Sequence, residues 1–171
     1  MKRLSLLFLL FLVAGCALIQ KKAEIVQWPS DVAFLEGEGD IDTAWKKERF
    51  SGSFVIRMEY PDILLLEVFG PFGQTLVYVS KEADRFLLVA GEEKTTDEAL
   101  FRKTYGFSVQ QFIDDLALKG QTNETPEGSV AERRGYKVIY SQDNRGRRKM
   151  CWQGAEGRIC LTFSDISFVR Q

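Results

Sequence analysis

Apolar and polar residues alternate over long stretches of this chain. The clearest stretch is 49–60. One of its faces carries Phe54, Ile56, Met58 and Tyr60, and the other carries Arg57 and Glu59. Successive side chains of a strand point to opposite faces of a sheet, so this alternation predicts strands at 34–43 and 49–60.

The next stretch, 63–69, is apolar at nearly every position and includes Leu64, Leu66 and Val68. A strand that is apolar on both faces is expected to be covered on both. Pro61 and Asp62 mark the turn before it. Further alternating stretches predict strands at 74–80, 85–90, 136–141, 149–153, 159–163 and 166–170, and the polar segment 121–130 predicts a surface loop.

Two helix-start patterns stand between the strands. Thr95 is followed three residues later by Glu98, and Ser108 is followed three residues later by Gln111. Both pairs match the capping box that opens helices. The second helix has a core-facing stripe at spacings of three and four, formed by Val109, Phe112, Ile113 and Leu116.

The order of strands, two helices and further strands predicts a mainly β (α+β) fold. Near-neighbour connections favour an antiparallel sheet that curls and carries the helices on one face. Such a sheet encloses a space. The pattern alone leaves open whether side chains fill this space or leave a cavity.

The N-terminus has a different pattern. A basic start, Lys2 and Arg3, precedes an apolar run of ten residues, 4–13, and then the small-residue site Ala14-Gly15-Cys16. This is the order of a signal peptide, and the run spans only about half of a ~30 Å hydrocarbon core. The string 12–16 resembles the lipobox of bacterial lipoproteins, with an ordinary secretory signal and a chance cysteine as the alternative. Residues 1–15 are therefore predicted to be a lipoprotein signal peptide, and Cys16 the lipidated first residue.

In proteins with a lipobox, an Asp after the cysteine resembles an inner-membrane retention signal. Here Ala17 follows Cys16, which favours the periplasmic face of the outer membrane. Two or three acyl chains give a firm anchor, whereas one chain binds only reversibly. Residues 16–31 are predicted to be the lipidated cysteine and its tether, and 32–171 a single domain.

Charge and composition exclude several classes of function. Once Lys2 and Arg3 leave with the signal, 21 basic residues stand against 24 acidic ones, which is not the footprint of a nucleic-acid-binding protein. The chain has no histidine, so it lacks the usual general base and the commonest metal ligand. We therefore expect no enzyme, no catalytic residue, no metal site and no cofactor.

Clusters of charge are interpreted as solvated surface. They include the acidic pair Asp114 and Asp115, for which a carboxylate pair or a cation site is the alternative. The basic run 145–149 is interpreted as a solvated hairpin turn, and contact with anionic lipid head groups is its alternative.

Two cysteines remain in a compartment that permits disulfides. Residues 147–153 and 158–163 are predicted to form a hairpin in which Cys151 lies opposite Cys160. Opposed residues of this kind lie about 4.5 Å apart at Cα, at the short end of disulfide reach. Both a cross-strand disulfide and a pair of small buried side chains fit this pattern.

The turn Gly70-Pro71-Phe72-Gly73 places a large apolar residue between two strands. Turn tips are usually polar. A bulky apolar side chain here predicts a contact site for a membrane or a partner, and folding back to plug the end of the barrel is the alternative.

Two segments carry a resemblance to a known family. They are 64–76, LLLEVFGPFGQTL, and 106–113, GFSVQQFI, which is followed by Gly120. In these segments and in its lipobox the chain resembles the LolB family of outer-membrane lipoprotein receptors, and more distantly the periplasmic carrier LolA. The resemblance covers most of 34–170, although the chain is shorter and has Phe72 where the family has Leu.

The resemblance implies an unclosed antiparallel barrel, or half-barrel, with a short helical lid over an apolar cavity for acyl chains. It also implies that Gly70, Pro71, Phe72 and Gly73 form a membrane-insertion loop. The expected cavity lining is the apolar set Phe54, Ile56, Met58, Leu64, Leu66, Val68, Phe112, Ile113 and Leu116.

The function expected from this resemblance is that of a monomeric receptor in the outer membrane. It would accept lipoproteins from a LolA-like periplasmic carrier and insert them into the outer-membrane lipid. Its partners would be the carrier, the cargo lipoproteins and the lipid, with no nucleic acid. The alternatives are a lipid- or glycolipid-binding envelope lipoprotein of the same fold, and a structural lipoprotein with a filled core.

Overall fold

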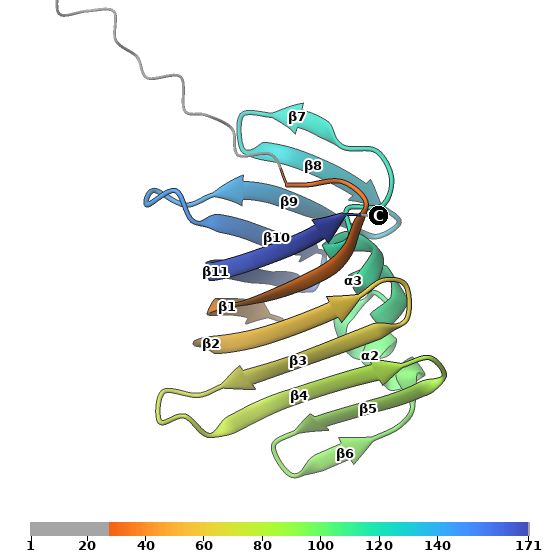
Figure 1. Ribbon diagram of the computed structural model, residues 1–171. Helices are drawn as coiled ribbons and strands as arrows, with labels where there is room; N and C mark the ends of the chain where they lie inside the picture. Colours follow the sequence, from red (N-terminus) through yellow and green to blue (C-terminus); the bar gives the residue numbers. More distant parts are fainter. Residues whose placement is uncertain (1–27, 171) are drawn as a thin grey trace, which may run out of the picture.

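A computed structural model describes residues 28–170. These residues form one eleven-stranded sheet and two short helices (Figure 1). The strands are β1 (Val32–Trp45), β2 (Glu48–Glu59), β3 (Ile63–Phe69), β4 (Thr75–Glu82), β5 (Arg85–Ala90), β6 (Glu93–Thr95), β7 (Asn123–Thr125), β8 (Gly128–Arg133), β9 (Tyr136–Gln142), β10 (Arg148–Gly154) and β11 (Gly157–Arg170). The helices are α2 (Glu98–Tyr105) and α3 (Val109–Leu116).

The sheet is antiparallel throughout and does not close. Its strand order is β6-β5-β4-β3-β2-β1-β11-β10-β9-β8-β7, so β6 and β7 are the two free edges. The first six strands form one meander and the last five another, and the two meanders join where β1 pairs with β11. The predicted mainly β, unclosed antiparallel sheet with helices on one side is confirmed.

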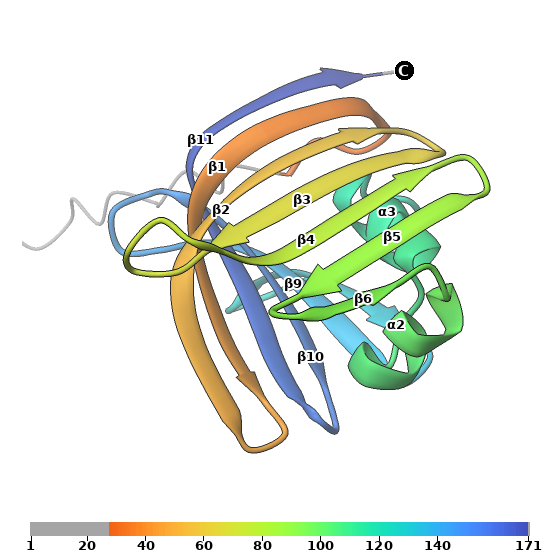
Figure 2. The ribbon, with the colours of Figure 1, turned by 90° about the horizontal axis from the view of Figure 1, so that it is seen from below.

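The long central strands give the sheet its curl. Figure 2 shows β1, β2 and β11 bending midway, so that one half of each strand belongs to each arm of the half-barrel. The pairing of β1 with β11 shifts at this region: Glu38 pairs with Asp165, whereas Gly39 pairs with Phe163. The extra residue, Ser164, forms a β-bulge, and bulges bend the strand that carries them. The predicted strands 159–163 and 166–170 are therefore one continuous strand.

Glycines allow the strands to approach closely near this bulge. A Cβ atom on Gly39 would lie 2.0 Å from the backbone oxygen of Thr162. A Cβ atom on Gly52 of β2 would lie 2.2 Å from the backbone oxygen of Phe69. Both distances are far below van der Waals contact, so only glycine fits at these positions.

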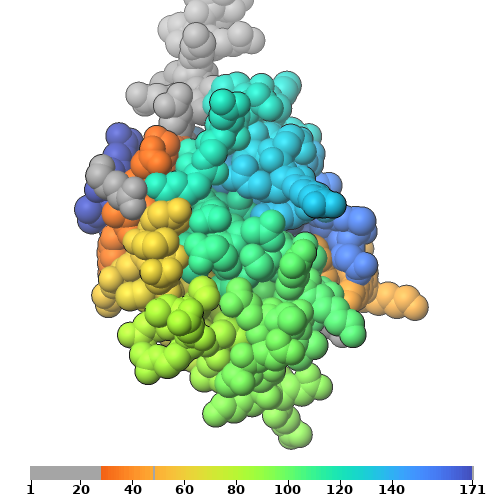
Figure 3. Space-filling view, turned by 90° about the vertical axis from the view of Figure 1, so that its right-hand side faces the viewer, coloured from red at the N-terminus to blue at the C-terminus, as the bar shows by residue number. Residues whose placement is uncertain are grey.

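The two helices lie inside the curl and cover the middle of the face seen in Figure 3. The buried stripe of α3 contains Val109, Phe112, Ile113 and Leu116, as its spacing predicts. The capping box of Ser108 and Gln111 is confirmed, with hydrogen bonds of 3.1 and 2.8 Å in the two directions. One core cluster joins these side chains to the concave face of the sheet. Neither helix in 28–170 is long and apolar enough to cross a membrane.

Three expectations for individual elements are wrong. Asp97, not Thr95, caps α2, because β6 continues to Thr95 and the Asp97 side chain accepts from the Ala99 N–H at 2.9 Å. The segment 121–130 is not only a loop, since its exposed residues 123–125 pair as the edge strand β7 with the start of β8. The described residues leave the outer face of β3 uncovered, and Leu65 is 36% exposed there.

We predict that Gly39→Ala lowers the free energy of unfolding by about 2–4 kcal/mol, because the new methyl group collides with backbone of β11. Chemical denaturation measures this loss. Gly154→Ala is the matched control in β10, where the nearest atom lies 3.3 Å from the new Cβ, and it should cost much less. Equal losses in the two variants would contradict the role of Gly39 in the bend.

Candidate functional site

A pocket of about 780 Å³ lies between the concave face of the sheet and helix α2. Its walls come from β1, β2, β3, β4 and β11, and α2, α3 and their linker close one side. Aromatic side chains dominate its lining: Trp45, Phe50, Phe101, Tyr105, Phe107 and Phe112. The volume falls within the range of small-molecule sites, about 300–1,000 Å³. The pocket is therefore large enough for a small molecule.

Four of the nine side chains expected at the cavity line this pocket. They are Leu64, Leu66 and Val68 of β3 and Phe112 of α3. The other five lie in the packed core and do not line the pocket: Phe54, Ile56, Met58, Ile113 and Leu116. The predicted face of β2 is buried, but its side chains belong to the core cluster that also contains the α3 stripe and Phe163, with the Phe54 and Phe163 ring centroids 5.1 Å apart.

Sequence reasoning missed the contribution of α2 and of the β1–β2 hairpin. Phe101 and Tyr105 stand four residues apart on α2, so their rings lie on one face, with centroids 4.7 Å apart. This spacing was the available signal. Trp45 and Phe50 come from the ends of β1 and β2, and only the bend of these strands brings them over the pocket.

Direct contacts connect α2 to the β1–β2 hairpin. The Trp45 Nε1–H donates to the backbone oxygen of Thr104 at 2.9 Å, and the rings of Trp45 and Tyr105 lie 6.3 Å apart. On the other side of α2, the Lys81 ammonium lies 3.4 Å from the Glu98 carboxylate. These contacts hold α2 across the pocket.

The pocket is suited to an apolar ligand. Among the described residues, the polar side chains of its lining are Thr43, Thr104 and the Tyr105 phenol, and the charged ones are Lys46 and Lys47. No carboxylate and no nucleophile–base pair of the described side chains lines it. An aliphatic chain that leaves water for such a site gains roughly 0.8 kcal/mol per methylene.

The turn 70–73 presents Phe72 to solvent in a fixed conformation. Phe72 is 93% exposed, so its side chain does not fold back to plug the barrel. The Gly70 N–H donates to the Gln74 oxygen at 2.9 Å, and the Gly73 N–H to the Gly70 oxygen at 3.0 Å. The Phe72 N–H also donates to Gln74 Oε1 at 3.2 Å. Backbone bonding therefore defines the position of this apolar tip.

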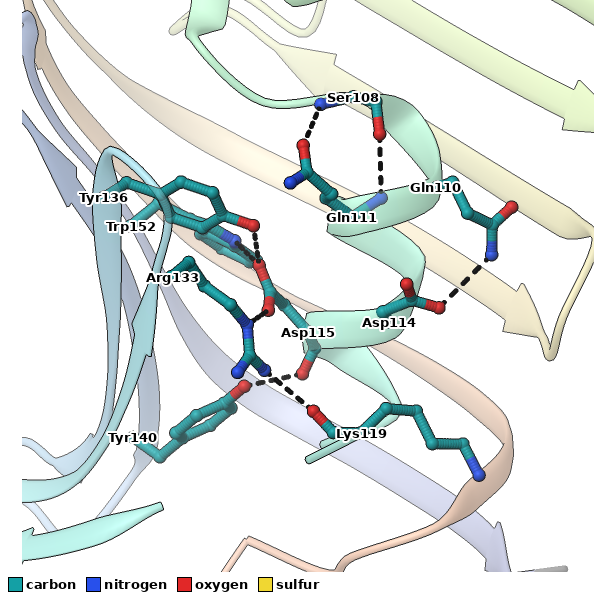
Figure 4. A network of polar contacts seen from close by, with 10 residues as sticks. All are labelled: Ser108, Gln110, Gln111, Asp114, Asp115, Lys119, Arg133, Tyr136, Tyr140 and Trp152. Carbon is teal, nitrogen blue, oxygen red and sulfur yellow. Dashed lines mark hydrogen bonds and ion pairs between the residues drawn. The ribbon is translucent and has the colours of Figure 1, made fainter. Parts of the chain in front are cut away.

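Asp115 on α3 is completely buried (0% exposed), so its interpretation as solvated surface is wrong. Its carboxylate accepts three hydrogen bonds (Figure 4). The donors are Arg133 Nε at 2.8 Å, Tyr136 Oη at 3.0 Å and Trp152 Nε1 at 3.0 Å. Burial raises the pKa of the Asp115 carboxyl, and these three partners oppose the increase. Burial of the two phenols, together with the nearby Asp115 charge, raises the pKa of Tyr136 and of Tyr140.

Side chains also satisfy carbonyl groups at the C-terminal end of α3 and just beyond it. The Tyr140 hydroxyl donates to the Asp115 backbone oxygen at 2.8 Å, and the Trp28 Nε1–H to the Leu116 oxygen at 3.2 Å. Arg133 Nη2 donates to the Lys119 oxygen at 2.8 Å. Helix ends leave such carbonyls without intrahelical partners. The network thus joins α3 to strands β8, β9 and β10, and none of its side chains lines the pocket.

Cys151 and Cys160 form a disulfide between directly opposed residues of β10 and β11, with Cα atoms 4.1 Å apart. Both belong to a small apolar cluster with Val130 and Ile139, separate from the main core. The disulfide therefore cross-links β10 and β11 of the second meander, on the face of the sheet that points away from the pocket.

The basic hairpin turn between β9 and β10 is only partly solvated. Arg147 forms ion pairs with Asp40 at 2.7 Å and with Asp143 at 2.8 Å. Arg148 lies over the ring of Phe168, at 5.2 Å from its centroid. Arg145 is exposed, with its backbone N–H bonded to Asp143.

Comparison with known proteins assigns no family to this chain. No family model matches it, and no curated protein matches it. The predicted lipidation site, Cys16, lies outside the described residues. The role of the chain must therefore be inferred from the geometry of the pocket, the Phe72 turn and the Asp115 network.

We predict that Asp115→Ala lowers the free energy of unfolding by about 3–5 kcal/mol, because it leaves a partly buried guanidinium and two buried donors without their acceptor. Asp114→Ala is the matched control. Asp114 is the adjacent residue on α3 and is half-buried, and among the described residues its carboxylate accepts one hydrogen bond, from Gln110 at 3.2 Å. Urea denaturation separates the two, and similar stabilities would refute the importance of the network.

A second prediction concerns pH. Because the folded state raises the pKa of Asp115 above 3.8, the stability contributed by this group is complete below pH 3.8 and is lost as the pH rises through the raised pKa. The stability of the wild type minus that of Asp115→Asn should therefore fall as the pH increases from 3.8. Denaturation at several pH values measures this difference, and a difference that grows with pH would contradict the raised pKa.

Proposed function

We propose that this protein is an outer-membrane-anchored receptor that accepts the acyl chains of lipoproteins from a periplasmic carrier and inserts the lipoproteins into the outer membrane. One observation carries the proposal: the apolar pocket extends to the base of the exposed Phe72 turn. Val68 of β3 and Leu76 at the start of β4 both line the pocket, and they flank the turn on its two strands.

The pocket supplies the binding step. Aromatic and aliphatic walls accept a hydrocarbon chain without an unsatisfied polar group, and each methylene removed from water contributes about 0.8 kcal/mol. The acyl chain of the lipoprotein would leave a similar apolar site on the carrier and end in the bilayer. A downhill gradient of affinity is sufficient for this route, and no energy source is required.

The Phe72 turn supplies the membrane step. An exposed Phe on a turn held by three hydrogen bonds is ready to enter a bilayer without reordering of the backbone. Burial of such a side chain contributes about 1.5–3 kcal/mol. Phe72 would therefore hold the mouth of the pocket near the acyl chains of the bilayer.

The basic hairpin turn supports the same orientation. In Figures 1 and 2 the β3–β4 turn and the β9–β10 turn project from the same side of the molecule, at the left. The second turn, 143–147, carries the exposed Arg145 and also Arg147, which is paired with Asp40 and Asp143. A basic residue near an anionic membrane surface contributes about 1 kcal/mol. We propose that this side faces the membrane to which the lipidated Cys16 attaches.

The resemblance to the LolB family adds a second line of support. The matched segment 64–76 forms strand β3, the Phe72 turn and the start of β4, and 106–113 forms the start of α3 and the linker before it. The half-barrel covered by α2 and α3 agrees with the fold that this resemblance implies. The family's role is proposed for this chain on these residues.

The test is to deplete a bacterium of the wild-type protein and to supply a variant in its place. With Phe72→Glu, transfer from the carrier should persist, whereas outer-membrane arrival of other lipoproteins should fall roughly ten- to a hundredfold, because the apolar tip no longer enters the bilayer. Membrane fractionation measures the arrival. Val169→Glu is the matched control, since Val169 is an exposed apolar residue, 58% exposed, near the end of β11.

Normal arrival with Phe72→Glu would refute the receptor proposal. Identification of lipid extracted with the purified protein then addresses the alternative. A bound phospholipid or glycolipid that carrier-borne lipoprotein does not displace would favour a lipid-binding envelope lipoprotein of the same fold.

A further inference from the structure

Two lysines stand at the mouth of the apolar pocket. Lys46 and Lys47 form the turn between β1 and β2, and both line the pocket while their side chains remain exposed. A residue that is both exposed and part of the lining lies where the pocket meets solvent. Figure 3 shows the orange tip of this hairpin projecting beside α2.

The position of this turn is fixed. Lys46 has a φ of 54°, and its backbone N–H donates to the Glu156 oxygen of the β10–β11 turn at 2.6 Å. Trp45, the preceding residue, donates to the Thr104 oxygen of α2 at 2.9 Å. Contacts on two sides therefore hold the lysine pair at the pocket.

The two ammonium groups have little competition from the described part of the protein. Lys46 Nζ lies 3.9 Å from Glu156 Oε2, at the limit of an ion pair. Lys47 forms no ion pair among the described side chains. Within the same set of side chains no acidic residue lines the pocket, although the chain has 24 acidic residues. The charge that these residues place at the mouth is therefore positive.

We propose that the pocket also binds a free lipid with an anionic head, a carboxylate or a phosphate, whose tail lies among the aromatic side chains and whose head pairs with Lys46 and Lys47. This inference rests on the proposed function, since it takes the pocket to be a site for acyl chains. It adds a second ligand, because the acylated cysteine of a lipoprotein has no anion at this point. Hydrogen bonds between an ammonium and an anion are short and strong, which orients the head at the mouth.

The test compares cis-parinaric acid with its methyl ester, two fluorescent probes that have the same tail. The full chain carrying Cys16→Ala is used, so that no attached acyl chain fills the pocket. It should bind the acid about three- to tenfold more tightly than the ester, since only the acid can form the exposed ion pairs with the two lysines. The preference should weaken at high salt, which screens exposed charges.

Lys46→Gln combined with Lys47→Gln should abolish this preference, so that acid and ester bind with equal affinity. Binding of the ester also shows that the double variant is folded. Lys103→Gln is the matched control: Lys103 is an exposed lysine on α2, one residue before Thr104, and does not line the pocket. It should retain the full preference for the acid.

Competition then identifies the anion. Oleate and oleoyl lysophosphatidic acid carry the same tail on a carboxylate and a phosphate, and stronger displacement by either one than by oleyl alcohol supports the proposal and names its head group. Equal displacement by all three, equal affinity for acid and ester, or a preference that survives the double substitution would overturn it. Failure of both probes to bind would instead refute the acyl-chain pocket itself, and with it the proposed function.

Discussion

The burial of one carboxylate determines where the helices lie in this fold. Asp115 brings a charge into the core, and the arrangement persists only because Arg133, Tyr136 and Trp152 donate to it from three neighbouring strands. A buried ion pair such as Asp115–Arg133 adds little net stability, because the loss of hydration of the two charges offsets their attraction. The hydrogen bonds of the carboxylate nevertheless restrict the position of α3. Helix α3 has one position in which all donors reach their acceptor, and that position also sets where the linker residue Phe107 and helix α2 lie.

The pocket is a consequence of this placement. With α3 fixed against the second meander, Phe112 and Phe107 pack toward Trp152, at ring-centroid distances of 4.6 and 6.4 Å. The first meander curves away from them, because β1 and β11 bend at the bulge and the glycines permit close approach there. The space left between the two arms is bounded by apolar side chains of both.

Local patterns predicted most of the elements but not their long-range consequences. The alternation in 49–60, the capping box at Ser108 and the register of Cys151 with Cys160 depend on near neighbours, and the structure has all three. The burial of Asp115 depends on donors 18 to 37 residues away in the chain, so its helical neighbours gave no sign of it. The pocket lining likewise depends on the bend, which moves the concave face of β2 into the core and the ends of β1 and β2 over the cavity.

The unclosed sheet also has a bearing on association between copies. A free sheet edge offers unpaired backbone groups to any other chain, which is a common origin of aggregation. Here both edges are three residues long, and they carry Glu93 and Lys94 on β6 and Glu124 on β7. An incoming strand would find few hydrogen bonds and would have to match or bury these charges. The sheet can thus remain unclosed without promoting edge-to-edge association of its copies.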